Sequence, residues 1–198
     1  MPLADARPHA AAWPARLPRE LVLPETTLWF NLEVSARRYP RKAAYVFFGR
    51  TLSFADLHGQ ALALAGWLQV QGVRKGDRVL LFMQNCPQFV VAFYAVQRAD
   101  AVVVPVNPMN RVEEFGHYIT DPQARVALTT ADLAPIVAEA SQRLPAHQRL
   151  QHIVATRRAD AMPAELDPLE SPSPAMLDWL RADPPLPAAC KRWADALA

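Results

Sequence analysis

Acidic and histidine side chains occur at helical spacing near residue 115. Glu114 and His117 are three residues apart, and Asp121 follows about one turn later. This Glu-x-x-His spacing places two metal-binding groups on one face of a helix. A dimetal centre needs a second copy of the motif, and the sequence contains none. The pattern therefore favours a solvated helix edge, and we predict no metal ligands.

A phosphate-binding loop requires closely spaced glycines at a turn from strand to helix. The six glycines form neither GxGxxG nor GxxxxGK[ST]; they are Gly49, Gly59, Gly66, Gly72, Gly76 and Gly116. No GxSxG motif is present, so a hydroxyl such as Ser53 is better explained as a helix cap. The residues alone thus predict no catalytic side chain and no cofactor held by this chain alone.

Composition excludes several classes of protein. Basic and acidic residues number 21 and 19 and are interspersed, so the sequence has no basic stripe of the kind that binds nucleic acid. Cys86 and Cys190 lie far apart, which argues against a disulfide framework and for a cytoplasmic setting. Residues 79–97 carry no charge, but Gln84, Asn85 and Pro87 interrupt them, so they fit a buried strand and helix better than a transmembrane span.

The first half of the chain predicts a helix, a hairpin and a second helix. Residues 26–39 have helical apolar spacing, and residues 44–48 and 51–54 form two strands. Gly49 and Arg50 between the strands predict a type II′ turn. The segment from Ser53 to Asp56 resembles a capping box, and the helix that it opens runs to Gly72.

The run from Arg78 to Pro108 predicts a βαβ unit. Its apolar strands are residues 79–83 and 101–106, and the helix between them, residues 87–98, has almost no polar face. A helix with Asn110 as cap and Glu113 as capping-box glutamate follows. Next come a strand at 125–128, a helix that Thr129 or Thr130 caps and that runs to about Ser141, and a strand at 152–155.

Strands that alternate with helices of this length predict an α/β fold with right-handed crossovers. We expect a partial doubly wound, mainly parallel sheet with flanking helices and an N-terminal β-hairpin. Prolines divide the chain into a Pro-rich arm at 1–24, an α/β subdomain at 25–155 and a Pro-rich connector at 156–198. The connector is expected to hold at most a short helix near residues 176–181 and another near its end.

Four motifs between Pro24 and Ala140 resemble the amino-terminal part of the AMP-forming acyl-CoA ligases, a family that includes luciferases and peptide-synthetase adenylation domains. They are TLSFADL (51–57), GVRKGDRVLLFMQNCPQFVVAFYAV (72–96), AVVVPVNP (101–108) and RVEEFGHYITDPQARVALT (111–129). Among the branches, the sequence looks most like the long-chain fatty-acid-CoA ligases. It departs from the family where Asp100 replaces a glycine, and Asp tolerates the left-handed backbone there at a cost of about 1 kcal/mol.

The resemblance implies an enzyme that uses ATP, Mg²⁺ and CoA to activate a carboxylate, such as a fatty acid. The phosphate loop, the Mg²⁺-binding pair and the mobile lysine of that family have no counterpart here, so we expect an amino-terminal fragment that is inactive alone. Its expected partners are the rest of the adenylating domain and the C-terminal lid domain. The resemblance also places Arg111 where some relatives have a basic residue facing the CoA nucleotide, although a surface ion pair is the more common role of an arginine at a helix N-terminus and is the favoured explanation.

An alternative is a stand-alone α/β binding or interaction module that keeps the fold without adenylation. In that case the apolar helix at 87–98 needs cover from a partner or from a second copy of the chain. We expect a cytoplasmic protein, with peripheral association with a membrane left open.

Overall fold

The computed structural model describes residues 12–18, 20, 22–166 and 171–198 of the chain. Along it lie α1 (Leu28–Arg38), β1 (Ala43–Phe47), β2 (Arg50–Ser53), α2 (Phe54–Val70), β3 (Arg78–Phe82), α3 (Pro87–Arg98), β4 (Val102–Pro105), α4 (Val112–Thr120), β5 (Val126–Thr130), α5 (Ala134–Arg143), η2 (Ala146–Gln148), β6 (His152–Thr156), η3 (Arg158–Ala161), α6 (Pro174–Arg181), β7 (Cys190–Arg192) and α7 (Trp193–Leu197). No helix in these ranges combines the length and apolarity needed to cross a bilayer.

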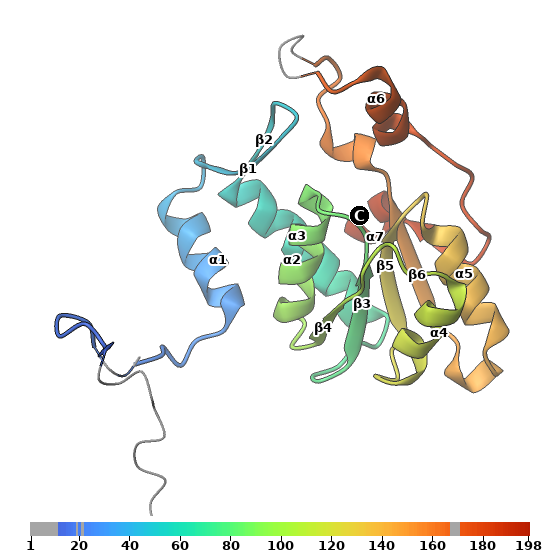
Figure 1. Cartoon of the computed structure of the whole chain (residues 1–198), viewed down its shortest axis with the longest axis horizontal. Helices are drawn as coiled ribbons and strands as arrows, with labels where there is room; N and C mark the ends of the chain where they lie inside the picture. The colour runs from blue at the N-terminus through green and yellow to red at the C-terminus, as the bar shows by residue number, and fades with distance from the viewer. Residues whose placement is uncertain (1–11, 19, 21, 167–170) are drawn as a thin grey trace, which may run out of the picture.

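The main sheet has the strand order β4-β3-β5-β6-β7, and all neighbouring strands are parallel. Leu80 of β3, for example, lies opposite Val104 of β4 and Ala127 of β5. Figure 1 shows α2 and α3 on one side of this sheet and α4 and α5 on the other. The predicted fold class, a mainly parallel sheet with helices on both faces and a separate hairpin, is confirmed.

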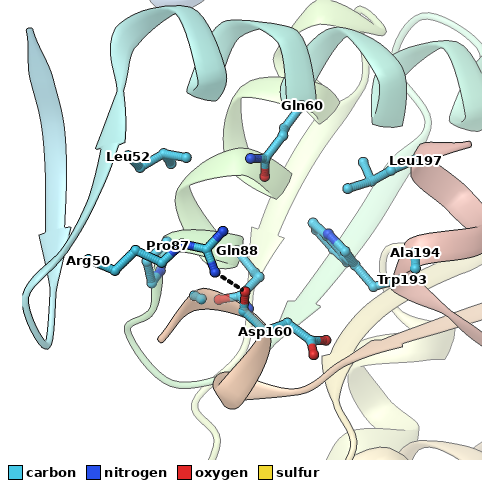
Figure 2. Close-up of a pocket in the computed structure, with 10 residues that line it drawn as sticks. Arg50, Leu52, Gln60, Pro87, Gln88, Asp160, Trp193, Ala194 and Leu197 are labelled. Atoms are coloured by element: carbon cyan, nitrogen blue, oxygen red, sulfur yellow. Dashed lines mark hydrogen bonds between the residues drawn. The ribbon is translucent and has the colours of Figure 1, made fainter. Parts of the chain in front are cut away.

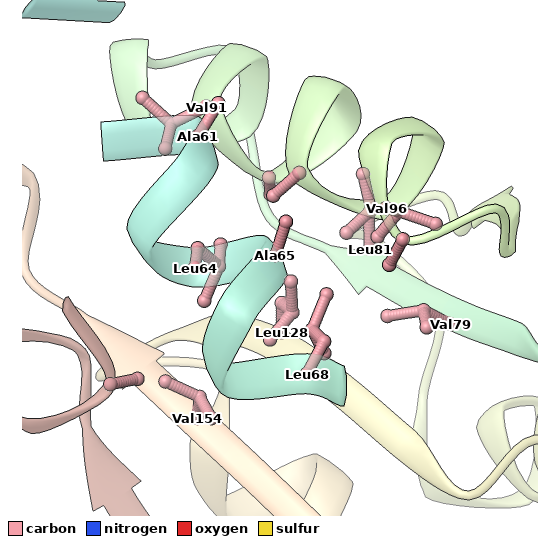
Figure 3. Packing of buried hydrophobic residues seen from close by; sticks show 14 of the residues in the cluster. Ala61, Leu64, Ala65, Leu68, Val79, Leu81, Val91, Val96, Leu128 and Val154 are labelled. Atoms are coloured by element: carbon pink, nitrogen blue, oxygen red, sulfur yellow. The ribbon is translucent and has the colours of Figure 1, made fainter. Parts of the chain in front are cut away.

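Two apolar cores cover the two faces of the sheet. On one face α2 and α3 pack against alternate residues of β3, β5 and β6, as Figure 3 shows for Leu64, Leu81, Val96, Leu128 and Val154. On the other face α4 and α5 cover the residues of the opposite parity, which include Leu80, Phe82, Ala127 and Ile153. Since both faces are covered, the strands are apolar throughout, which explains why continuous apolar runs predicted them.

The N-terminal hairpin differs from the predicted turn. Phe47 pairs with Arg50, so the two turn residues are Phe48 and Gly49 rather than Gly49 and Arg50. Both have positive φ, at 47° and 81°, as in a type I′ turn. The capping box from Ser53 to Asp56 is confirmed: Asp56 N donates to Ser53 Oγ at 3.1 Å, and Ser53 N donates to Asp56 Oδ2 at 3.2 Å.

Two predicted helix starts are wrong, one by a single residue and the other by three or four. The N-cap of α4 is Arg111, not Asn110, and its backbone N–H donates to Glu114, not Glu113. Thr129 and Thr130 lie inside β5 instead of capping α5. The side chain of Thr129 instead lies toward the neighbouring strand, where its hydroxyl donates to the carbonyl oxygen of Phe82 at 2.7 Å.

The segment expected to be a connector, residues 156–198, contributes to the sheet. Its strand β7 pairs in parallel with β6, and Trp193 and Ala196 of α7 join the core beneath α2. The sheet therefore extends past the predicted boundary at residue 155. The short helix expected near residues 176–181 is present as α6. Most of the predicted arm at 1–24 lies outside the described residues, and residues 12–18 and 22–24 are exposed.

Candidate functional site

The carboxyl edge of the sheet is the place where this topology can build a site. From β3 the chain crosses to β4 on one side, and from β5 it continues to β6 and β7 on the other side. In open α/β sheets, ligands bind outside the carboxyl ends of the strands where the winding direction reverses. The reversal here lies between β3 and β5, whose ends are joined by the Thr129 hydroxyl.

A nearly buried ion pair lies beyond this edge. Arg158 lies two residues after the end of β6, and its Nη2 donates to Asp132 Oδ2 at 2.9 Å. The Arg158 side chain is 6% exposed and the Asp132 side chain 28%. The guanidinium also stacks on Trp179 of α6, with Cζ 3.8 Å from the ring centroid. This Asp132–Arg158 pair therefore ties the ends of β5 and β6 to the otherwise peripheral helix α6.

Several buried polar atoms at the same edge lack a hydrogen-bond partner within the described part of the chain. They are Gln88 Oε1, Thr130 Oγ1, Asp132 Oδ1 and Arg158 Nε; the remaining buried atom of this kind is Trp67 Nε1. An unpaired buried donor or acceptor costs about 1–3 kcal/mol. Buried polar groups are otherwise almost always paired, so this edge has hydrogen-bonding capacity left for water or a ligand.

The thiol of Cys86 lies at the start of α3 but is not activated. Burial raises the pKa of this thiol above its ordinary value. The nearby Arg158 and the backbone N–H groups at the helix start oppose that effect, but burial dominates. Because the thiolate is the reactive form, burial disfavours Cys86 as a nucleophile, and its side chain packs in the core.

A pocket of about 340 Å³ opens beside this edge, and Figure 2 shows its lining. We call it the hairpin pocket, because Arg50 and Leu52 of β2 form one wall. The start of α3 contributes Gln88, and α7 contributes Trp193. Gln60 of α2 and residues of η3 complete the lining. Five separate elements thus converge on one cavity.

Arg50 docks the hairpin against η3 and the residue that follows it. Its Nη1 donates to the carbonyl oxygens of Asp160 and Met162, at 2.9 and 3.3 Å. The carboxylate of Asp160 is itself held by Arg157, which donates to Oδ1 from Nε and Nη2 at 3.0 and 2.8 Å. These contacts hold two lining residues of the pocket, Arg50 and Asp160, in place.

The predicted site residue Arg111 does not line the hairpin pocket. It is exposed at the N-terminus of α4, after the carboxyl end of β4, so it lies along the same edge of the sheet. Its backbone N–H donates to Glu114 Oε2 at 2.7 Å. Glu114 is thereby used as a capping residue, and the described residues contain no group of three or more His, Cys, Asp or Glu side chains placed to hold a metal ion.

The backbone also does not fit a triphosphate. Positive φ occurs at Gly49, in the hairpin turn, and at Gly72 and Gly76, which precede β3 at the opposite edge of the sheet. None of the glycines opens a helix at the carboxyl edge, where backbone N–H groups would have to gather around phosphates. We therefore derive no phosphoryl-transfer step through this chain.

Two further groups with shifted pKa values, His152 and Cys190, lie at the amino ends of β6 and β7. Burial lowers the pKa of His152, and the charges of Lys191 and Arg125 lower it further. Burial raises the pKa of Cys190 to about 11. The His152 ring packs edge-on against Trp67, with ring centroids 5.8 Å apart.

Sequence reasoning missed the residues that make up this edge. Asp132 and Arg158 each follow a buried strand by two residues, which is a recognisable signal for the carboxyl edge of a parallel sheet. Gln88 carried the weaker signal of a polar residue in an otherwise apolar helix. No sequence pattern joins Arg50 to η3, since 110 residues separate it from Asp160.

The family model of AMP-binding enzymes matches residues 32–194, which is most of the chain and includes β7. The chain belongs to the AMP-binding enzyme family. It is 41% identical over 133 residues to a long-chain-fatty-acid–CoA ligase of Bacillus subtilis, covering 67% of this chain and 24% of the relative. It is 31% identical over 153 residues to the enzyme of the same name from Escherichia coli, covering 76% and 26%.

Solved structures of this family show the same fold. The N-terminal domain of FACL13 from Mycobacterium tuberculosis, determined with a bound inhibitor, matches with a TM-score of 0.60 and 28% identity. That match covers 68% of this chain and 34% of the domain. The chain thus spans about a quarter of the length of the curated family members that it matches, and the resemblance predicted from its motifs is confirmed.

Proposed function

We propose that this chain is the amino-terminal scaffold of an ATP-dependent, AMP-forming ligase that joins a long-chain fatty acid to CoA in the cytoplasm. The observation that carries the proposal is the family match over residues 32–194 on a sheet of the expected topology. The named relatives are long-chain-fatty-acid–CoA ligases, which supports this substrate class. In the complete enzyme ATP, Mg²⁺ and CoA are the cofactors.

In this proposal the chain positions groups but does not catalyse adenylation by itself. Support comes from the glycines, whose positions do not fit a phosphate cradle. The test is carboxylate-dependent exchange between ATP and pyrophosphate with the purified 198-residue chain and palmitate. We expect no exchange above a blank without protein, and robust exchange would overturn the scaffold role.

Arg111 is proposed to contact the CoA nucleotide. Its side chain is exposed at the carboxyl edge and free of any ion pair within the described ranges. An exposed guanidinium of this kind binds phosphate well. NMR titration of the chain with CoA should show weak binding that Arg111→Ala abolishes. Arg125→Ala is the matched control, because Arg125 is exposed at the opposite edge.

The remainder of the adenylating domain and the lid domain are the proposed partners. Large apolar side chains on α1 and the hairpin support this, since Leu28, Phe30 and Val46 are 51%, 46% and 61% exposed. Apolar surface of this kind is usually covered in an assembled protein. A homodimer would cover the same surface. Light scattering on the purified chain separates a monomer with exposed surface from a dimer.

A further inference from the structure

We propose that the hairpin pocket binds a small amphipathic molecule with a neutral planar head that carries both a hydrogen-bond donor and an acceptor, as a carboxamide does. The occupant is an aryl or alkyl amide rather than a carboxylate or an amine. This binding needs neither ATP nor CoA, so it stands apart from the proposed ligase function.

Gln88 is the residue that requires a hydrogen-bond donor on the ligand. Gln88 is 5% exposed, and its Nε2 donates to the carbonyl oxygen of Arg157 at 2.9 Å. That bond fixes the orientation of the amide, while Oε1 has no partner among the described residues. Because Gln88 lines the pocket, a ligand N–H group is the natural partner for this oxygen.

The demand for an acceptor comes from Arg50. Two backbone carbonyl oxygens occupy its Nη1, which leaves other guanidinium N–H groups able to donate. Figure 2 shows this guanidinium reaching from β2 toward Gln88 and η3. A ligand amide between these two residues would accept a hydrogen bond from Arg50 through its carbonyl oxygen. Its N–H group would donate a hydrogen bond to Gln88 Oε1.

The charges around the pocket exclude the two ionic alternatives. An ammonium group would lie beside the Arg50 cation, and the Asp160 carboxylate, which would otherwise attract it, is already paired with Arg157. A carboxylate has no N–H or O–H to give to Gln88 Oε1, so that buried oxygen would face a second unpaired acceptor. A neutral donor–acceptor head satisfies both groups.

The apolar part of the ligand is accommodated by the opposite walls. Leu52 of β2 and Leu197 of α7 face the cavity from two sides, and the Trp193 indole lies between the polar groups and Leu197 (Figure 2). Ligand pockets in proteins have volumes of about 300–1,000 Å³. At about 340 Å³ the hairpin pocket is at the lower limit, so it suits a single ring or a short chain.

The test is an NMR titration of the full chain, labelled with ¹⁵N, with benzamide, benzoate and benzylamine. These probes share one ring and differ in the head group. We expect benzamide to shift the indole N–H of Trp193, which is identified by its loss in Trp193→Phe. We also expect benzamide to bind at least tenfold more tightly than benzoate or benzylamine.

Two variants and a control make the outcome decisive. Gln88→Leu removes the buried acceptor, and Ala194→Trp fills the cavity from an exposed position; each should weaken benzamide binding at least tenfold. Ala63→Trp, on an exposed position of α2 outside the pocket, should bind like the parent chain. If Gln88→Leu does not fold, Ala194→Trp still gives the answer. Equal affinity for the three probes, or benzamide binding that survives Ala194→Trp, would refute the proposal.

Discussion

Replacing Arg158 with Met should destabilise the chain far more than any exposed ion pair would suggest. The substitution removes the cation but keeps an unbranched side chain of similar length. It leaves the Asp132 carboxylate without its 2.9 Å partner and removes the contact with Trp179. The loss can be divided into these two contributions.

The first contribution is the broken ion pair. Removing one member of a buried pair costs about 3–5 kcal/mol, because a charge remains without compensation. Here the remaining charge belongs to Asp132, whose side chain is 28% exposed, so solvent screens it and about 2 kcal/mol is the better value. The cation–π contact with Trp179 adds about 1 kcal/mol. We therefore expect a loss of about 3 kcal/mol in the free energy of unfolding.

The matched control is Arg143→Met. Arg143 pairs with Glu139 at 2.6 Å, a shorter distance than in the Asp132–Arg158 pair, but both side chains are more than half exposed. Exposed pairs of this kind contribute about 0.5 kcal/mol. If the distance between the charges determined the energy of an ion pair, Arg143→Met would cost more stability than Arg158→Met. If burial determines it, Arg158→Met costs more.

Urea unfolding followed by tryptophan fluorescence and far-UV circular dichroism measures both losses, provided that the slope with urea stays unchanged. Asp132→Asn combined with Arg158→Met should recover part of the loss, because the stranded charge is gone. A loss below 1 kcal/mol for Arg158→Met, or one no larger than for Arg143→Met, would show that the pair does not stabilise the edge.

Three further predictions concern other parts of the fold. Asp100→Gly should stabilise the chain by about 1 kcal/mol in urea unfolding, because Asp100 has φ of 58°, whereas Asp121→Gly, at φ of −60°, should not. Burial lowers the pKa of His152, so the unfolded chain binds this proton at higher pH than the folded chain does. The contribution of neutral His152 to the free energy of unfolding should therefore be fully present above about pH 6.5 and should be lost as the pH falls below that value. Thermal melts of His152→Gln should lack this part of the pH dependence of stability. Burial raises the pKa of Cys86 and raises that of Cys190 to about 11, so both should react with iodoacetamide at pH 8 only slowly until urea unfolds the chain, and fast reaction of the folded protein would contradict this.

The sheet could be predicted because its strands are buried on both faces. Val79 to Met83 are continuously apolar, and helix 87–98 is too apolar to lie on a surface, so a βαβ unit was the simplest solution. Asp100 was expected to adopt left-handed geometry from the family pattern, and its φ of 58° confirms this. These features are encoded locally, by burial and by backbone geometry.

Strand β7 and the hairpin pocket could not be predicted in the same way. The three residues Cys190–Arg192 include two charged ones, which is too short and too polar for a periodic signal. They form a strand only because β6 offers a free edge beside them. The pocket depends on Arg50 meeting η3, a contact that arises from tertiary packing and has no local pattern.

The distribution of unpaired atoms argues that the carboxyl edge is the functional side of this scaffold. Two apolar cores already stabilise the faces of the sheet, so nothing in the packing requires polar groups to be buried without partners. All of those identified in the described residues, apart from Trp67 Nε1, belong to Gln88, Thr130, Asp132 and Arg158 at this edge. Since each unpaired group lowers stability, apolar replacements would give a more stable scaffold. Retaining polar groups there makes physical sense if this edge forms hydrogen bonds with a bound ligand. Both proposals, CoA at Arg111 and an amide in the hairpin pocket, place a ligand at this edge.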